Sequence, residues 1–293
     1  WSVDNQPYGT WWERLPALCY PPSHPFHHSL IGSFEDLEAA SLEDVAGFFR
    51  TYYTPDNAVL TIAGDFDARD ARAMVERHFT VIPRGTGRPP LPPMELPRTF
   101  GERKREVVED DVMLSRLFLA FRTSVFGSDD YYAGSVCAVV LGQRRGSRLY
   151  RALVREREVA SEVSAFTWDL AKGADLFVVD ATARPGTDAE TLEAAVVTEI
   201  DHLRTEGVRA DEVERALALI ETDYVSSMQA AGDRADALSK FATLFGDPAL
   251  VNEQLDHYRA VSAEAVTAFA REFLGEDNRA SLVYVPRVVE AGA

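Results

Sequence analysis

The sequence predicts an α+β protein built from two tandem homologous domains, the first of which is incomplete. Three observations lead to this prediction. Strands precede helices in the second half of the chain, a segment near residue 41 recurs near residue 262, and a proline-rich stretch separates the two copies. Strands followed by helices are the order typical of an α+β domain.

The first part of the chain is expected to hold a helix from about Leu42. Ser41 and Asp44 have the spacing of a capping box at its start. Four apolar residues then fall on one helical face, namely Val45, Phe48, Phe49 and Tyr52. Asp56-Asn57 predicts a turn, and after it residues 59–64 are expected to form a strand and residues 68–79 a helix.

A proline-rich stretch over residues 84–99 is the clearest boundary. Its prolines fix φ and remove backbone donors, so this stretch should run extended and exposed as an interdomain linker. We therefore assign residues 1–83 to the back part of the first domain and residues 100–293 to the second. The elements expected after the linker are strands at 105–108 and 114–121, a buried helix at 131–141, a turn at 142–146, a helix at 147–155, strands at 159–166 and 176–182, and helices from 189 onward.

An internal repeat supports the duplication. When the chain is shifted by 221 positions, identical residues coincide, namely Ser41, Glu43, Val45, Phe48, Arg50, Asp56 and Asn57 with Ser262, Glu264, Val266, Phe269, Arg271, Asp277 and Asn278. Two unrelated amphipathic helices with similar caps are the alternative, but helix patterning does not explain the shared Asp-Asn turn. Because the second copy begins near Arg103, the same offset places the start of the first copy well before Trp1. The first copy is therefore expected to be truncated.

Composition excludes several classes of function. The 293 residues carry a formal net charge of -17, which argues against non-specific binding to nucleic acid or to an anionic membrane, while basic peptides remain possible partners. The longest apolar run, residues 133–141, is about half of the roughly 18 residues that a membrane span needs. Two cysteines are too few for a disulfide framework. We expect a soluble protein and leave its compartment open between bacterial cytoplasm and cell envelope.

Several segments together resemble the pitrilysin/insulinase-type zinc metallopeptidases, the inverzincins, which include the mitochondrial processing peptidases. The resemblance rests on Pro7-Tyr-Gly9, Tyr20 to His28, Ile31 to Leu37, Ser41 to Val45, Tyr52 to Leu60, Gly64-Asp65, Gly146 to Tyr150 and Ala160 to Phe166. It implies tandem domains of the LuxS/processing-peptidase-like type, each with an antiparallel-rich sheet flanked by helices, that close in pairs around a peptide. Peptides in such enzymes add as a strand to a sheet edge.

The family's chemistry uses an H-x-x-E-H helix, whose two His bind zinc and whose Glu activates the bound water, with a later Glu as third ligand. This chain lacks that motif. The resemblance implies that the missing Glu lies a few residues before Trp1, so that zinc belongs to the intact parent protein. We expect no catalytic residue and no metal ligand in this chain, and no hydrolysis of peptides by the chain alone.

His24-Pro-Phe-His-His28 has the spacing H-x-x-H-H and superficially mimics the inverted zinc motif. A zinc helix needs both outer His on one face, but Pro25 biases His24 away from the helical region, and His27 would be a poor base beside a metal. We interpret the segment as a structural loop, with an adventitious metal site as the alternative.

Other family members carry an Arg and, seven residues later, a Tyr that hold the substrate backbone and the developing oxyanion. Alignment through Ser147 to Tyr150 and Ala160 to Phe166 places Val154 and Ser161 at those positions, and neither can do that work. The pattern resembles the zinc-bearing subunit of bacterial two-subunit members, whose partner supplies Arg and Tyr. We therefore hypothesise that the parent is a zinc subunit working as a heterodimer.

Arg144, Arg145 and Arg148 are the candidate substrate-binding residues, because the resemblance places their loop near the peptide path. The alternative is a plain turn with exposed Arg, since the loop lacks the Lys-Ser/Thr of a P-loop. Tyr8, Trp11 and Trp12 are expected to pack against the truncated domain and not to form a ligand cage.

Two functional hypotheses follow from these observations. In the first, the chain is part of a zinc metalloendopeptidase subunit and is inactive without its zinc helix. In the second, it comes from a non-catalytic scaffold or core homologue of the same family. The sequence before Trp1 would distinguish them, and we favour the enzyme because the segment at Trp1 resembles the usual continuation of an intact zinc site.

Overall fold

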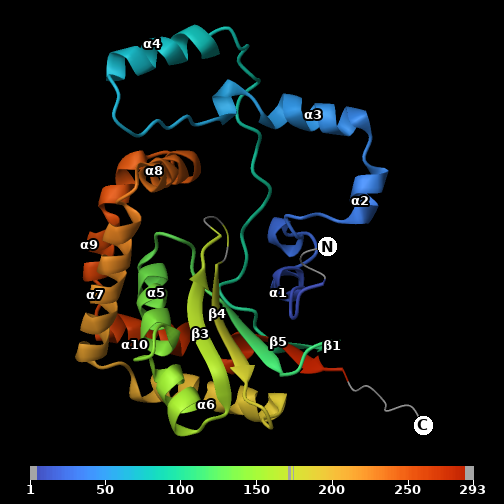
Figure 1. Cartoon of the computed structure of the whole chain (residues 1–293), viewed down its shortest axis with the longest axis vertical. Helices are drawn as coiled ribbons and strands as arrows, with labels where there is room; N and C mark the ends of the chain where they lie inside the picture. Colours follow the sequence, from blue (N-terminus) through green and yellow to red (C-terminus); the bar gives the residue numbers. More distant parts are fainter. Residues whose placement is uncertain (1–4, 171–172, 174, 288–293) are drawn as a thin grey trace. The chain divides into compact units, whose positions relative to one another are not determined.

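One five-stranded sheet organises most of the chain (Figure 1). The computed structural model describes residues 5–170, 173 and 175–287. The strands are β1 (Lys104–Asp110), β2 (Arg116–Arg122), β3 (Ala160–Trp168), β4 (Leu176–Ala183) and β5 (Arg279–Pro286), in the spatial order β1-β5-β2-β4-β3. Only the β1 and β5 pair is parallel, and the other three pairs are antiparallel. The predicted antiparallel-rich sheet and the four strands predicted after the linker are confirmed.

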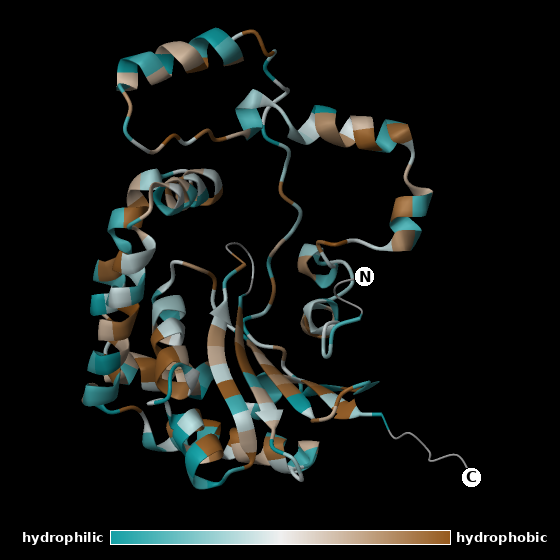
Figure 2. Ribbon diagram, viewed as in Figure 1, coloured by the Kyte–Doolittle hydropathy of each residue, from teal (hydrophilic) through white to brown (hydrophobic). Residues whose placement is uncertain are grey.

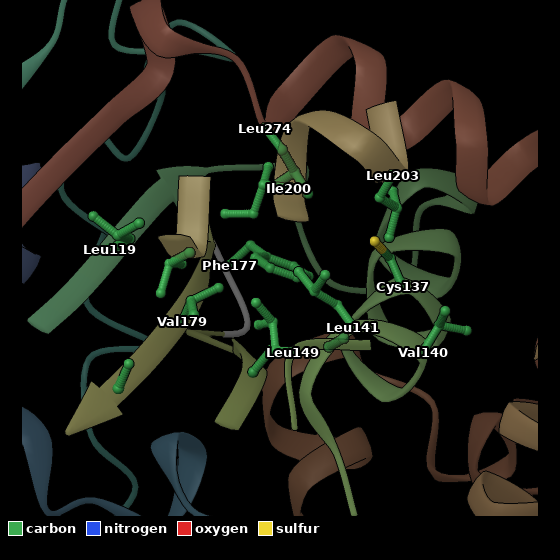
Figure 3. Packing of buried hydrophobic residues seen from close by; sticks show 14 of the residues in the cluster. Leu119, Cys137, Val140, Leu141, Leu149, Phe177, Val179, Ile200, Leu203 and Leu274 are labelled. Atoms are coloured by element: carbon green, nitrogen blue, oxygen red, sulfur yellow. The ribbon is translucent and has the colours of Figure 1, made fainter. Parts of the chain in front are cut away.

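Helices α5 (Asp129–Gly142), α6 (Ala189–Glu206) and α10 (Ala263–Phe273) pack on one face of this sheet. The core between them includes Leu119, Phe177 and Val179 from the strands, all fully buried (Figure 3). Every residue of α5 from Tyr131 to Gly142 is buried, as the uniformly apolar sequence predicts. Helix α5 lies so close to the sheet that only small residues of the helix can contact the strand backbone. A Cβ on Gly142 would lie 2.3 Å from the backbone nitrogen of Ala165.

Helix α1 (Trp11–Cys19) covers part of the opposite sheet face. Leu15 and Cys19 are fully buried there, and the Trp11 ring stacks on Phe118 with 4.9 Å between centroids. The expectation that Trp11 packs against the truncated first domain is therefore wrong. The physical reason is that the second-domain sheet is apolar on both faces and needs a cover, and a segment distant in sequence provides it.

The described chain divides into two compact units by its internal contacts. One comprises Trp1–Leu30, Pro93–Ile220 and His257–Ala293, and the other Ile31–Pro92 and Glu221–Asp256. These units follow contacts and not the repeat, so they differ from the boundaries at residues 83 and 99 drawn from the sequence. Trp1 itself lies outside the described residues. Residues 84–97 contain no helix or strand and are mostly exposed, as their prolines predict.

The second unit is helical. Its helices are α2 (Phe34–Ala39), α3 (Leu42–Tyr52), α4 (Ala68–Phe79) and α8 (Ala231–Phe245), with 3-10 turns at Pro55–Asn57 and Pro248–Asn252. The predicted capping box is confirmed, because the Ser41 hydroxyl accepts a bond from the Asp44 amide and the Asp44 carboxylate accepts one from the Ser41 amide. The strand predicted at 59–64 is wrong: these residues form no helix or strand and pair with no described strand. A strand forms only where another strand can accept its backbone bonds.

Two further helices complete the described chain, α7 (Ala210–Ser227) and α9 (Gln254–Arg259). The segment after the 142–146 turn is a π-helix over Tyr150–Glu156, at the place where the sequence predicts an ordinary helix. Among the described residues, no helix has the length and apolar character needed to cross a membrane.

Candidate functional site

The predicted site residues lie on the edge strand β3 and on the turn and π-helix that precede it. Among the described strands β3 pairs only with β4, so the other side of its backbone has no strand partner. An open edge presents a row of amide and carbonyl groups that can accept an added strand. Position 161, which the sequence alignment singled out, lies on this strand and position 154 lies in the π-helix shortly before it.

A pocket of about 250 Å³ opens beside this edge. It is lined by Tyr150, Ser161, Glu162, Val163, Ser164 and Asp180. The Asp180 carboxylate is already neutralised, because Arg116 donates to both of its oxygens at 2.8 and 2.5 Å. The hydrogen bonds that Arg116 donates to Asp180 raise the pKa of Arg116 in spite of its partial burial. The remaining charge in the pocket is the exposed Glu162 carboxylate, so the pocket is weakly acidic.

Val154 lies in the π-helix, where it follows two other buried residues, and it is only 8% exposed. Its side chain packs into the core, and its carbonyl accepts a bond from Nη2 of Arg184 at 3.3 Å. That guanidinium also pairs with Glu158 at 3.2 Å. The alkyl side chain at position 154 has no group that can hold a substrate oxygen.

Ser161 occupies a β-bulge in β3, where the register between β3 and β4 shifts. Its hydroxyl lies 3.2 Å from the carbonyl oxygens of both Thr182 and Ala183 on β4, to which it donates. The hydroxyl is thus directed back to the neighbouring strand. Neither Val154 nor Ser161 presents a polar group of the reach that a Tyr or an Arg would have.

The turn between α5 and the π-helix places two of the predicted arginines in solvent. Arg144 and Arg145 are both exposed, and Arg144 has a positive φ of 64°. Ser147 ends the turn, because its amide and its hydroxyl both donate to the Arg144 carbonyl. Positive charge is therefore displayed on a turn that precedes the π-helix and the edge strand. Its position is compatible with contact to a bound peptide or to water.

Arg148 has a different environment. Its guanidinium donates to both carboxylate oxygens of Glu212 at 2.9 and 2.6 Å, and to the carbonyl of Gly207 at 2.8 Å. The two side chains are 12% and 2% exposed. Burial raises the pKa of Glu212, but the hydrogen bonds from Arg148 and from the Arg209 amide outweigh it, so the pKa is lowered. Arg148 thus fastens the start of the π-helix to the α6–α7 connection.

The segment with the spacing H-x-x-H-H is a loop with a 3-10 turn, Pro25–His27, as its proline predicts. His24 is extended, is 4% exposed and stacks on Tyr20, and its Nδ1 accepts a bond from the Phe26 amide. Its Nε2 lies 3.3 Å from the Met94 carbonyl. His27 and His28 each have a ring nitrogen within 3.1 Å of other backbone carbonyls. The three rings serve local structure.

The zinc that the family resemblance implies does not fit the part of the chain that the structure describes. No group of three or more His, Cys, Asp or Glu side chains there is arranged to hold a metal ion. Cys19 and Cys137, the two potential thiolate ligands, are fully buried, and burial raises the pKa of each to about 12. We therefore derive no chemical step through a metal from these residues.

Sequence reasoning missed two residues that the fold brings to this region. Tyr150 and Arg184 are far apart in sequence, yet Tyr150 lines the pocket and Arg184 contacts the Val154 carbonyl. Tyr150 belongs to the Ser147 to Tyr150 segment that was recognised, but nothing in the sequence shows that it faces the edge strand. Arg184 directly follows β4, and only the β3 and β4 register places it near the π-helix.

A model of the family described as "Peptidase M16 inactive domain" matches residues 39–220. The chain is also similar to curated zinc proteases. It is 25% identical over 275 residues to zinc protease PqqE of Helicobacter pylori, covering 94% of this chain and 58% of the relative. It is 22% identical over 259 residues to a probable mitochondrial-processing peptidase beta subunit of Arabidopsis thaliana, covering 85% and 48%. The chain thus spans about half of the length of these relatives.

Solved structures share the fold. A protease from Helicobacter pylori superposes with a TM-score of 0.88 at 22% identity, covering 98% of this chain and 68% of that one. The peptidase M16 inactive domain from Pseudomonas fluorescens superposes with a TM-score of 0.82 at 17% identity, covering 98% and 67%. These matches confirm the α+β fold, and the family model together with the curated zinc proteases confirms the resemblance to the zinc peptidases. The chain belongs to the peptidase M16 inactive domain family and is homologous to zinc proteases.

Proposed function

We propose that this chain is the non-catalytic part of a zinc metalloendopeptidase subunit and that it helps to hold a peptide for cleavage by a zinc site elsewhere. One observation carries the proposal. The two positions where active relatives are expected to contact the reacting peptide bond hold a buried Val154 and a Ser161 whose hydroxyl is directed to β4. The binding surface beside them, the β3 edge, is open. The chain therefore retains a place for a peptide without the groups that act on it.

The peptide would add to β3 as an extended strand, with its backbone paired to the free edge and alternate side chains directed into the pocket. The exposed Glu162 carboxylate and the overall charge of -17 favour a peptide of net positive charge. Arg144 and Arg145 remain candidate contacts for peptide carbonyls or for a terminal carboxylate. Arg148 is assigned a structural role, because Glu212 and Gly207 take its donors.

The domain boundaries and the partner belong to the same proposal. Residues 1–83 are the back part of a first, zinc-bearing domain, residues 84–99 are the linker, and residues 100–293 are the second domain. Zinc is bound by the intact parent. Because Val154 and Ser161 replace the Arg and Tyr, a second family subunit would supply those two side chains, and the active form would be a heterodimer.

Peptide binding tests the proposal directly. A fluorescein-labelled basic peptide of about ten residues is titrated with the purified chain, and its fluorescence anisotropy is followed. N-methylation of the peptide amides that pair with β3 should weaken binding at least about tenfold, while N-methylation at alternate amides should not, since only one set of amides faces the strand. Equal effects of the two methylation patterns would contradict strand addition.

Two charge variants check the chemistry of the pocket. Glu162→Arg should weaken binding of the basic peptide, while Glu214→Arg on the exposed face of α7 makes the same change of net charge away from the pocket and should have little effect. Proteolysis is then assayed with the intact parent, alone and with the candidate partner subunit. Robust turnover by the parent alone would refute the heterodimer, and no turnover with any partner would favour the scaffold alternative.

A further inference from the structure

The first and second copies of the repeat have the same local structure. Helices α3 and α10 both begin after a serine N-cap, Ser41 or Ser262, whose hydroxyl accepts a bond from the amide three residues on. Each helix is 11 residues long and is followed by a 3-10 turn, Pro55–Asn57 in one copy and Glu276–Asn278 in the other. Because the helix and the turn recur at the offset of 221, each residue of α3 has a counterpart whose neighbours are known.

The two copies differ in what covers them. The apolar face of α10 is buried, with Val266, Phe269, Ala270 and Phe273 all 2% exposed or less. The corresponding residues of α3 are 45–53% exposed, namely Val45, Phe48, Phe49 and Tyr52. Apolar residues are visible along α3 in Figure 2. The covering of α10 comes from α5 and α6, and a Cβ on Gly134 of α5 would lie 2.7 Å from the Phe269 ring. Helix α3 has the same surface without such a cover.

The asparagine that ends each copy's turn gives an independent observation. In the second copy, the Asn278 side-chain amide donates to the carbonyls of Phe273 and Arg122, and its oxygen accepts a bond from the Phe100 amide. In the first copy, the Asn57 amide donates to the Tyr52 carbonyl, which is the counterpart of the Phe273 bond. Asn278 also bonds to Arg122 of β2 and to Phe100 before β1. The hydrogen bond described for Asn57 corresponds to neither of these. The Asn57 residue itself is half-buried.

The extended segment after the turn shows the same difference. Residues 280–285 form the body of β5, which has β1 on one side in parallel and β2 on the other in antiparallel register. Their counterparts at 59–64 pair with no described strand, although Leu60 and Ile62 point apolar side chains to solvent, at 56% and 47% exposure. The Ser239 hydroxyl of α8 donates to the Thr61 hydroxyl at 2.7 Å. This bond uses the Thr61 side chain and does not involve the backbone of the segment.

We propose that α3, the Asn57 turn and residues 59–64 form one docking surface for an α+β module that lies outside the 293 residues. The chemistry of its occupant follows from the second copy. It supplies one strand parallel and one strand antiparallel to residues 59–64, a backbone amide and a carbonyl for Asn57, and a helix with a small residue that faces Phe48. This inference rests on the incomplete first copy in the proposed function and adds to it which residues receive the missing part and how.

The occupant is a further segment of the parent polypeptide and not a second copy of this chain. The curated relatives are longer than the chain, which covers 58% of the Helicobacter pylori relative, so residues are available for such a module. In a second copy the equivalent strands β1 and β2 are already paired with that copy's own β5. Strand β1 keeps one open edge, but β2 is paired on both sides, with β5 and β4, so it could pair with another molecule only if one of those strands left.

Hydrogen exchange followed by mass spectrometry tests the proposal. It compares the 293-residue chain with a longer form of the parent polypeptide, the longer product, that carries the proposed module. In the chain alone, amides 59–64 should exchange freely while amides 280–285 are protected. In the longer product, amides 59–64 should slow at least about a hundredfold, because paired strand amides exchange only on opening. Unprotected amides at 59–64 in the longer product would overturn the proposal. Peptide binding at β3 is measured separately, so each proposal can fail without the other.

Two variants and one concentration series sharpen the test. Phe48→Ser should reduce the protection of amides 59–64 in the longer product and leave the melting of the isolated chain unchanged. Met113→Ser removes an apolar side chain of 94% exposure elsewhere and should do neither. Val45→Thr is the milder substitution if Phe48→Ser prevents folding of the longer product, and it should give a smaller loss of the same sign. Protection of 59–64 that rises with concentration in the isolated chain, together with a dimer in light scattering, would identify a second copy as occupant and refute the inference.

Discussion

Replacing Arg148 is expected to destabilise the protein strongly, although this residue is a candidate for substrate contact. Arg148→Met removes three hydrogen bonds and leaves the Glu212 carboxylate, 2% exposed, without its main partner. Breaking a buried ion pair from one side costs about 3–5 kcal/mol. For a protein of this size that free energy corresponds to a fall in melting temperature of roughly 6–20 °C.

The control variants separate the ion pair from a loss of charge. Arg184→Met breaks an ion pair whose side chains are 37% and 64% exposed, and it should cost less than about 1 kcal/mol. The double variant of Arg148→Met with Glu212→Leu removes both charges and should recover most of the loss, because an apolar pair of similar volume is often neutral. The assay is thermal and urea unfolding followed by circular dichroism at pH 7.

Two results would refute this reasoning. The first is a cost for Arg148→Met no larger than that for Arg184→Met, which would mean that Glu212 does not depend on Arg148. The second is a double variant as unstable as the sum of its single variants, which would mean that the two side chains are not coupled. Either result would return Arg148 to the list of free candidate contacts for a peptide.

Three further predictions concern pH, thiol reactivity and helix packing. Because the pKa of Glu212 is lowered below its ordinary value of 4.5, its contribution to stability should be complete at neutral pH and lost as the pH falls through the folded-state pKa, and Arg148→Met should move acid unfolding to higher pH. Cys19 and Cys137, whose pKa burial raises to about 12, should react with iodoacetamide at pH 8 about a thousandfold more slowly than in denaturant, and rapid labelling of the native protein would contradict their burial. Gly134→Ala should cost about 1–3 kcal/mol because its Cβ would meet the Phe269 ring, while Gly47→Ala in the exposed α3 should stabilise by up to about 1 kcal/mol, both measured by thermal unfolding.

Local patterns in the sequence predict most of the secondary structure. The Ser41 and Asp44 capping box, the four strands after the linker and the buried helix α5 are all present where the residues indicate, because each depends on neighbours within a few positions. The strand predicted at 59–64 shows the limit. Its residues are mostly apolar, as those of β5 are, but only strands from elsewhere in a chain can pair with it.

The candidate site shows the same division. The sequence shows that Val154 and Ser161 stand where other family members have Arg and Tyr, since this depends on residue type alone. The role of Arg148 cannot, because Glu212 lies 64 positions away and becomes its partner only after α6 and α7 have packed. The pocket beside β3 also could not be predicted. Tyr150, Ser161 and Asp180 come from three separate elements whose register is set by the sheet.

The sequence by itself determined the α+β class, the duplication at an offset of 221 residues and the kinship with zinc peptidases, because these are recorded in residue identity and spacing. The tertiary structure decided which copy of the repeat is covered. Helix α10 lies in the core, whereas α3, with the same pattern, is about half exposed. It also placed α1 on the five-stranded sheet and paired Arg148 with Glu212. Burial and pairing depend on partners distant in sequence, so two segments of one chain with the same helix and turn have different environments.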